Sequence, residues 1–108
     1  MINKTLPINL DLSAIKRFCQ DNNIKKLSLF GSVLRDDFTS LSDVDILVEF
    51  KEGKTPGFDI IRMEDELSLI VSRKVDLRTY YDLSKYFRDE VLTEAKIIYD
   101  SSNCINKY

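Results

Sequence analysis

A chain of 108 residues has room for one domain with one hydrophobic core, which predicts a single domain over residues 1–108. With 16 basic and 18 acidic residues it has no general positive field, so direct nucleic-acid binding is not expected. Two cysteines, Cys19 and Cys104, exclude a disulfide scaffold, and the absence of histidine argues against a zinc site. There is no signal-peptide pattern and no run of ~20 apolar residues for a membrane span, so the expected location is the cytoplasm.

Hydrophobic periodicity predicts helices and strands in alternation. After a loose arm over 1–10, helices are predicted at about 12–20, 58–71 and 83–95, with a short helical segment from Ser32 to about Asp36. Strands are predicted at 24–30, 44–50, 74–78 and 97–99, and 100–108 is expected to fray. Asp11 is a plausible N-cap for the first helix, and Phe87, Val91 and Leu92 should point inward from the last. This order indicates an α/β (α+β) fold, with a small mixed sheet and helices packed mainly on one face of a core at about 12–99.

Three aspartates occupy similar settings on two of these strands. Side chains alternate along a strand, so Asp43 and Asp45 share a face, with Cα atoms roughly 6–7 Å apart. Asp76, between Val75 and Leu77, points to the same face if the two strands are neighbours. Two carboxylates at ~4 Å repel by about 4 kcal/mol at an effective dielectric near 20, so such a cluster calls for a cation. An all-oxygen ligand set favours Mg²⁺ or Mn²⁺, which completes its shell with phosphate oxygens.

The segment Gly31-Ser32 stands between a predicted strand and a helical segment. Glycine lets the backbone approach an anion closely, and the free N–H groups that follow can bind phosphate. Ser32 can donate its hydroxyl, and Arg35 is a further candidate phosphate partner. Taken singly, each of these motifs is more often an ordinary turn or a solvated strand end. Their combination, in this order and with consistent facing, predicts one nucleotide-triphosphate and metal site. Tyr80 and Tyr81 could be modified or stack on a base, although half-buried turn packing is the favoured interpretation.

These motifs resemble the nucleotidyltransferase superfamily that includes polymerase β, and especially its minimal single-domain branch. The matching pattern is Phe30-Gly31-Ser32, then Asp43-Val44-Asp45, then Val75-Asp76-Leu77, within a similarity that runs from about Leu27 to Tyr99. The resemblance implies that Asp43 and Asp45 bind metal ions bridging the triphosphate of ATP, and that Asp76 completes the metal site and helps deprotonate the acceptor. It also implies that Gly31 and Ser32 hold the β- and γ-phosphates. Asp36 stands where these domains often have glycine.

The resemblance further implies a partner. Small domains of this branch are commonly antitoxins that add AMP to a tyrosine of a HEPN-domain toxin, which predicts AMPylation and a hetero-oligomer. Two alternatives stay open: a nucleotidyltransferase acting on a small molecule, and a non-catalytic module that only docks a partner. The first usually carries an added helical domain, and the three aspartates argue against the second.

Overall fold

A computed structural model describes residues 8, 10–35, 38–39, 42–54, 57 and 59–101. Asp36, Asp37, Cys104 and most of the two expected loose ends lie outside the described residues. Ile8 and Leu10, from the expected N-terminal arm, are partly buried against the core. None of the described helices is long and apolar enough to cross a membrane.

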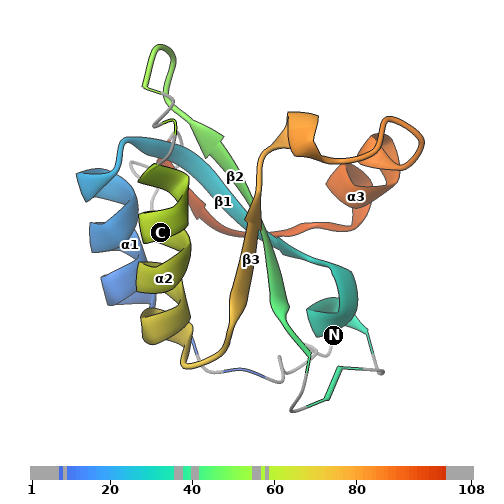
Figure 1. The fold of residues 1–108 in the computed structure, drawn as a ribbon, viewed down its shortest axis with the longest axis horizontal. Coiled ribbons are helices and arrows are strands. Elements are labelled where there is room, and N and C mark those ends of the chain that lie inside the picture. Colours follow the sequence, from blue (N-terminus) through green and yellow to red (C-terminus); the bar gives the residue numbers. More distant parts are fainter. Residues whose placement is uncertain are drawn as a thin grey trace.

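The described chain forms three α-helices, two short 3₁₀ segments and four strands (Figure 1). In chain order these are α1 Leu12–Asp21, β1 Ile24–Phe30, η1 Gly31–Leu34, β2 Val44–Phe50, α2 Asp59–Val71, β3 Val75–Arg78, η2 Tyr80–Asp82, α3 Arg88–Glu94 and β4 Lys96–Asp100. The sheet order is β3-β2-β1-β4. β1 pairs antiparallel with β2 and β4, while β2 and β3 run parallel, so the predicted mixed sheet is confirmed.

Local sequence explains why α1 begins and ends where it does. The carboxylate of Asp11 accepts the N–H of Ala14 at 3.1 Å, which caps the first turn. At the other end, the side chain and backbone N–H of Asn22 both donate to the carbonyl of Phe18. Asn23 then takes a left-handed φ of 57°, which stops the helix and turns the chain into β1.

The core lies between the sheet and the pair α1 and α2, which cover one face side by side (Figure 1). β1 and β2 supply alternate residues to it: Leu27, Leu29, Val44, Ile46 and Val48. Among the described elements, η2 and α3 lie over the opposite face, at one end of it (Figure 1). The prediction of helices mainly on one face is therefore confirmed, and the described residues leave the other face, called the open face below, partly uncovered.

The prediction of a helix over 83–95 is wrong in its first half. α3 contains only Arg88–Glu94, and the residues before it form turns. The carbonyl of Leu83, which would accept the N–H of Phe87 in a helix, instead accepts Nε of Arg88 at 3.0 Å. Phe87 and Leu92 do not point into the core as predicted, because they are 44% and 49% exposed.

Candidate active site

The aspartates on β2 and β3 meet on the open face of the sheet. Asp45 and Asp76 are direct partners in the parallel ladder, so both side chains leave the sheet on the same side. Asp45 is half-buried, while Asp43, just before β2, is exposed. The sequence predicted this shared face on the condition that the two strands are neighbours, and the condition is met.

The electrostatics of Asp45 agree with this clustering. Burial is the largest cause raising the pKa of Asp45 above its ordinary value, and the charges of Asp76 and Asp43 raise it further. The cations Arg78 and Arg35 lower it in part. The charges of Asp43 and Asp76 are thus close enough to oppose the ionisation of Asp45, and this is the repulsion that a bound cation would relieve.

Helix α2 fixes the position of β3, and with it Asp76. The N–H of Val75 donates to Oγ of Ser68 at 3.0 Å, and the N–H of Leu77 donates to a carboxylate oxygen of Glu64 at 2.8 Å. These are the backbone donors on either side of Asp76. The two hydrogen bonds to α2 therefore fix the backbone that carries the third carboxylate. Glu64, which the sequence analysis did not single out, is half-buried.

The Gly31 turn lies directly against Asp45. Gly31 has a φ of +78°, and a Cβ built on it would overlap the carboxylate of Asp45 and lie 3.1 Å from its Cγ. Only glycine satisfies both the conformation and the space. The helix expected from Ser32 is a 3₁₀ turn over Gly31–Leu34, so backbone N–H groups, rather than a helix dipole, are what it offers an anion.

Arg35 follows this turn and is exposed. Its guanidinium lies 3.8 Å from the carboxylate of Glu94 on α3, and it is close enough to Asp45 to lower its pKa. The residue that follows η1 and the last residue of α3 therefore meet beside Asp45. A bridge between such exposed groups is weak, so Arg35 can exchange Glu94 for a phosphate at little cost.

Arg78 is a site residue that sequence reasoning missed. Its Nε and Nη2 donate to the two carboxylate oxygens of Asp76 at 3.0 and 3.2 Å. This hydrogen bonding is the main cause that raises the pKa of Arg78. The signal was present in the sequence, because Asp76 and Arg78 stand two apart on one strand and so share a face.

The arrangement can accommodate a divalent cation through carboxylate oxygens. In the part of the chain that the structure describes, no three ligating side chains converge on one point, and Asp76 is turned to Arg78. The donor set of Asp43, Asp45 and Asp76 nevertheless suits Mg²⁺ or Mn²⁺, and their mutual repulsion favours such an ion. Metal binding would have to draw Asp76 away from Arg78.

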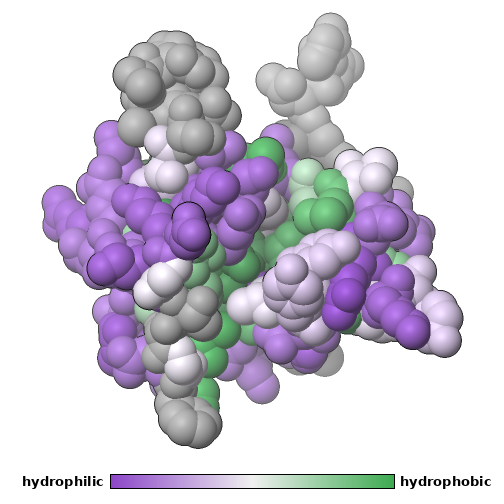
Figure 2. All heavy atoms as spheres, turned by 90° about the horizontal axis from the view of Figure 1, so that it is seen from above, coloured by the Kyte–Doolittle hydropathy of each residue, from purple (hydrophilic) through white to green (hydrophobic). Residues whose placement is uncertain are grey.

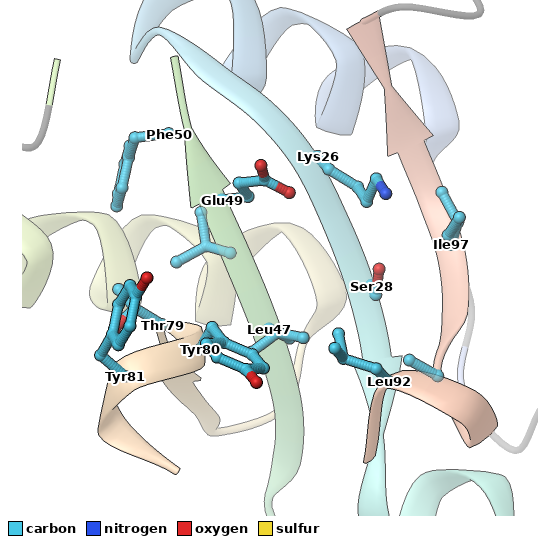
Figure 3. A pocket seen from close by; sticks show the side chains of 12 residues that line it. Lys26, Ser28, Leu47, Glu49, Phe50, Thr79, Tyr80, Tyr81, Leu92 and Ile97 are labelled. Atoms are coloured by element: carbon cyan, nitrogen blue, oxygen red, sulfur yellow. The ribbon is translucent and has the colours of Figure 1, made fainter. Parts of the chain in front are cut away.

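Beyond the acids, the same face contains a cavity of about 500 Å³ (Figure 3). Tyr80 and Tyr81 form one wall, and Leu92 and Ile97 form the opposite one (Figure 3). Leu47 and Ser28 lie on the sheet between these walls. Figure 2 shows hydrophobic side chains reaching the surface between hydrophilic regions on either side.

The interpretation of the tyrosines as half-buried turn packing holds for only one of the pair. Tyr80 is half-buried, but Tyr81 is 80% exposed. Their rings meet edge to face at 5.3 Å, and the guanidinium of Arg88 lies over both. The positions of Tyr80 and Tyr81 are therefore fixed by their contact with each other and with Arg88 at the start of α3.

Comparison with known proteins agrees with this geometry. The family described as "Polymerase beta, Nucleotidyltransferase" matches residues 13–103. A protein of Methanocaldococcus jannaschii, provisionally named a protein adenylyltransferase, is 39% identical over 74 residues, which cover 68% of this chain and 78% of that protein. A second protein of that organism with the same kind of name is 39% identical over 66 residues, covering 59% of this chain and 66% of its own.

Solved structures share the fold. One provisionally described as a minimal nucleotidyltransferase has a TM-score of 0.64 and 32% identity, covering 78% of this chain and 85% of that one. A chain of a toxin–antitoxin crystal structure with AMP-PNP has a TM-score of 0.67 at 22% identity, covering 84% and 74%. A chain of an AMPylated HEPN toxin–MNT antitoxin complex from Shewanella oneidensis has a TM-score of 0.60 at 20% identity, covering 87% and 73%. With the paired acids, the Gly31 turn and the family match together, this chain belongs to the polymerase β nucleotidyltransferase family.

Proposed function

We propose that this protein transfers AMP from ATP to a hydroxyl of a partner protein, and that it does so as the antitoxin of a HEPN-domain toxin. The observation that carries the proposal is the placement of Asp45 and Asp76 as a same-face pair with Gly31 against Asp45. The names of the relatives and the toxin–antitoxin neighbours support the protein acceptor and the HEPN partner. Work on such a partner would take place in the cytoplasm, where the buried thiol of Cys19 stays reduced.

In this proposal different residues bind the metal and the phosphates. Asp43 and Asp45 hold the divalent metal, with Asp76 completing the set. Gly31 and Ser32 receive the β- and γ-phosphates through backbone N–H groups and a hydroxyl, and Arg35 adds a positive charge. Mg²⁺ or Mn²⁺ held by these carboxylates would supply positive charge against the negative charge that develops on the phosphate oxygens.

The acids also handle the proton of the acceptor. The hydroxyl must lose its proton as its oxygen bonds to the α-phosphorus, and the proposal assigns this proton to Asp76, which would first have to leave Arg78. Positioning and charge stabilisation account for most of the rate in phosphoryl and nucleotidyl transfer, so rigid support from α2 matters here.

The test is transfer of label from ATP. The protein is incubated with α-labelled ATP, Mg²⁺ and a HEPN-domain protein from the same genome, and the intact mass of that candidate partner is measured by mass spectrometry. We expect AMP on the partner, and a loss of about 10²–10³-fold or more when Asp43→Asn and Asp45→Asn are combined. Asp65→Asn, an exposed aspartate on α2, is the matched control.

Other outcomes separate the alternatives. Label on a small-molecule acceptor and none on protein would identify a small-molecule nucleotidyltransferase. A tight complex with the partner, unlabelled under all metal conditions, would identify a docking module. Unchanged labelling by the double variant would contradict the roles given to the two aspartates.

A further inference from the structure

The backbone around Asp43 is held from outside its own strand. Asp43 is exposed and stands just before β2, and the ladder between β2 and β3 begins after it, with the pair Val44 and Val75. Because Asp43 lies outside this ladder, the position of its carboxylate depends on what holds the two peptide groups that flank it.

Both of these peptide groups are bound by the connection between α2 and β3. Nη2 of Arg73 donates to the carbonyl of Ser42 at 3.3 Å. The carbonyl of Lys74 accepts the N–H of Val44 at 2.8 Å. Two consecutive residues of one connection therefore hold the backbone immediately before and immediately after Asp43.

Arg73 makes further contacts with residues that precede Asp43. The same Nη2 donates to the carbonyl of Thr39 at 2.6 Å, and the guanidinium lies 4.6 Å from the centre of the Phe38 ring. Thr39 and Ser42 also hold each other, because the N–H of Ser42 donates to the carbonyl of Thr39 and the N–H of Thr39 donates to Oγ of Ser42, both at 3.0 Å. The described residues before Asp43 thus form one hydrogen-bonded unit that is anchored on Arg73.

The end of α2 fixes the position of Arg73 in turn. Ser72 has a left-handed φ of 60°, and the N–H of Arg73 donates to the carbonyl of Ser68 at 3.2 Å. Ser68 also accepts the N–H of Val75 through its Oγ. One helix end therefore places both Arg73 and the strand that carries Asp76.

We propose that Arg73 is a positioning residue of the metal site, which holds the carbonyl of Ser42 and so sets the direction in which Asp43 presents its carboxylate to the ion. The inference rests on the proposed function, in which Asp43 binds Mg²⁺ or Mn²⁺, and it adds a residue that prepares this ligand without touching the ion. Loss of a residue that orients a metal ligand commonly lowers metal affinity or activity by about 10–100-fold.

A positioning role and a simple charge role predict opposite effects on metal affinity. Arg73 is a cation, so removing its charge alone would make its surroundings more negative and Mn²⁺ binding tighter. Removing its hydrogen bonds instead frees the backbone of Asp43, and the ion must then order that backbone when it binds. The direction of the change in affinity therefore separates the two roles.

Calorimetric titration of the folded protein with Mn²⁺ measures that direction without any turnover. Arg73→Met keeps an apolar stem and removes every donor, and we expect it to weaken Mn²⁺ binding about tenfold. Arg73→Lys restores a positive group that can donate to the same carbonyls, so it should recover most of the lost affinity. Arg62→Met is the matched control, because Arg62 also joins two elements through hydrogen bonds, to Glu66 on α2 and to Asn22 after α1. It should bind Mn²⁺ like wild type.

Hydrogen exchange of the metal-free protein tests the same role without any ion. In Arg73→Met we expect faster amide exchange at Ser42 and Val44, whose N–H groups are hydrogen-bonded on either side of the acid. Ile46, inside β2, should exchange as it does in wild type. Exchange that rises equally at all three residues would indicate a general loss of stability and would contradict a positioning role.

The transfer assay gives a third measurement. A high concentration of metal fills the site even when Asp43 is not held in place. Arg73→Met should therefore need about tenfold more Mg²⁺ for half of its maximal rate, with kcat at saturating Mg²⁺ near that of wild type. A fall in kcat that no concentration of Mg²⁺ restores would overturn the inference.

The outcomes distinguish this inference from the proposed function. If wild type transfers no AMP, the proposed activity fails, and Mn²⁺ binding still decides the role of Arg73. If wild type binds no Mn²⁺, the proposed metal site fails and the inference fails with it. If wild type binds Mn²⁺ and Arg73→Met binds it at least as tightly, the inference fails alone. It also fails alone if Arg73→Lys binds no better than Arg73→Met, or if Arg62→Met loses as much affinity.

Discussion

The two faces of the sheet are built from the same strands and have different tasks. On the face toward α1 and α2, residues such as Leu27 and Ile46 are fully buried and fill one core. On the open face, the residues between them include Asp45, Glu49 and Lys26, which stay partly in contact with water. Because side chains alternate along a strand, one face can hold the fold together while the other carries charges that oppose it.

The largest effect is expected from breaking the covered face. Leu67 of α2 is fully buried in the core, so Leu67→Ala should lower the free energy of unfolding by about 2–5 kcal/mol. Leu69→Ala, on the solvent side of the same helix, should change it by less than about 0.5 kcal/mol. Urea unfolding measures both, and equal losses for the two variants would contradict the assignment of the core to one face.

Gly31→Ala should damage the open face more than it damages the fold. The left-handed φ costs about 1–2 kcal/mol for a residue with a Cβ, and the overlap would push Asp45 aside. We expect a loss of nucleotidyl transfer of about 10²-fold or more, as for a misplaced reacting group. Gly53→Ala is the control, because Gly53 has a φ of +74° and no atom within 4 Å of its would-be Cβ. It should show the same strain and normal transfer.

Periodicity predicted the covered face well because that face is made by burial alone. The strands of β1 and β2 have the predicted bounds, and α1 and α2 differ from theirs by one residue. The prediction of the last helix was wrong because a side chain, Arg88, takes the carbonyl of Leu83, and no hydrophobic pattern reports such a bond.

The open face was only partly predictable. The three aspartates and Gly31 could be placed from alternation, since each lies at or near a strand end. The Asp76–Arg78 pair and the support of β3 by Glu64 and Ser68 depend on side-chain contacts between or within elements. The cavity walls come from segments far apart in the chain, whose meeting requires the folded sheet.

The pH dependence of stability should report the crowding of carboxylates on the open face. The pKa of Asp45 is raised by burial and by Asp76 and Asp43, so the folded state binds the proton more tightly than the unfolded state. Ionised Asp45 therefore destabilises the fold, and its contribution worsens as pH rises from the ordinary aspartate value through the raised one. Asp45→Asn should gain stability relative to wild type over this window and hold the gain above it. Denaturant unfolding at several pH values measures the difference, and a difference that did not vary with pH would contradict the coupling.

The smallest change in stability is expected for Arg78→Gln. Its effect on metal binding should distinguish Arg78 from a residue in an ordinary surface ion pair. Arg78 and Asp76 are both substantially exposed, so Arg78→Gln should lower the free energy of unfolding by no more than about 1 kcal/mol. The same change removes the cation that competes for Asp76, so the metal site should bind Mn²⁺ several-fold more tightly. Calorimetric titration of the folded protein with Mn²⁺ measures this without any turnover.

Arg62→Gln is the matched control for that titration, because Arg62 pairs with Glu66 at 2.6 Å on the far side of the sheet, on α2. It should cost a similar fraction of a kcal/mol and leave Mn²⁺ affinity unchanged. If Arg78→Gln weakened Mn²⁺ binding, the guanidinium would be orienting Asp76 for the metal rather than competing with it. The guanidinium of Arg78 would then preorganise the carboxylates of the open face, whereas apolar packing orders the covered face.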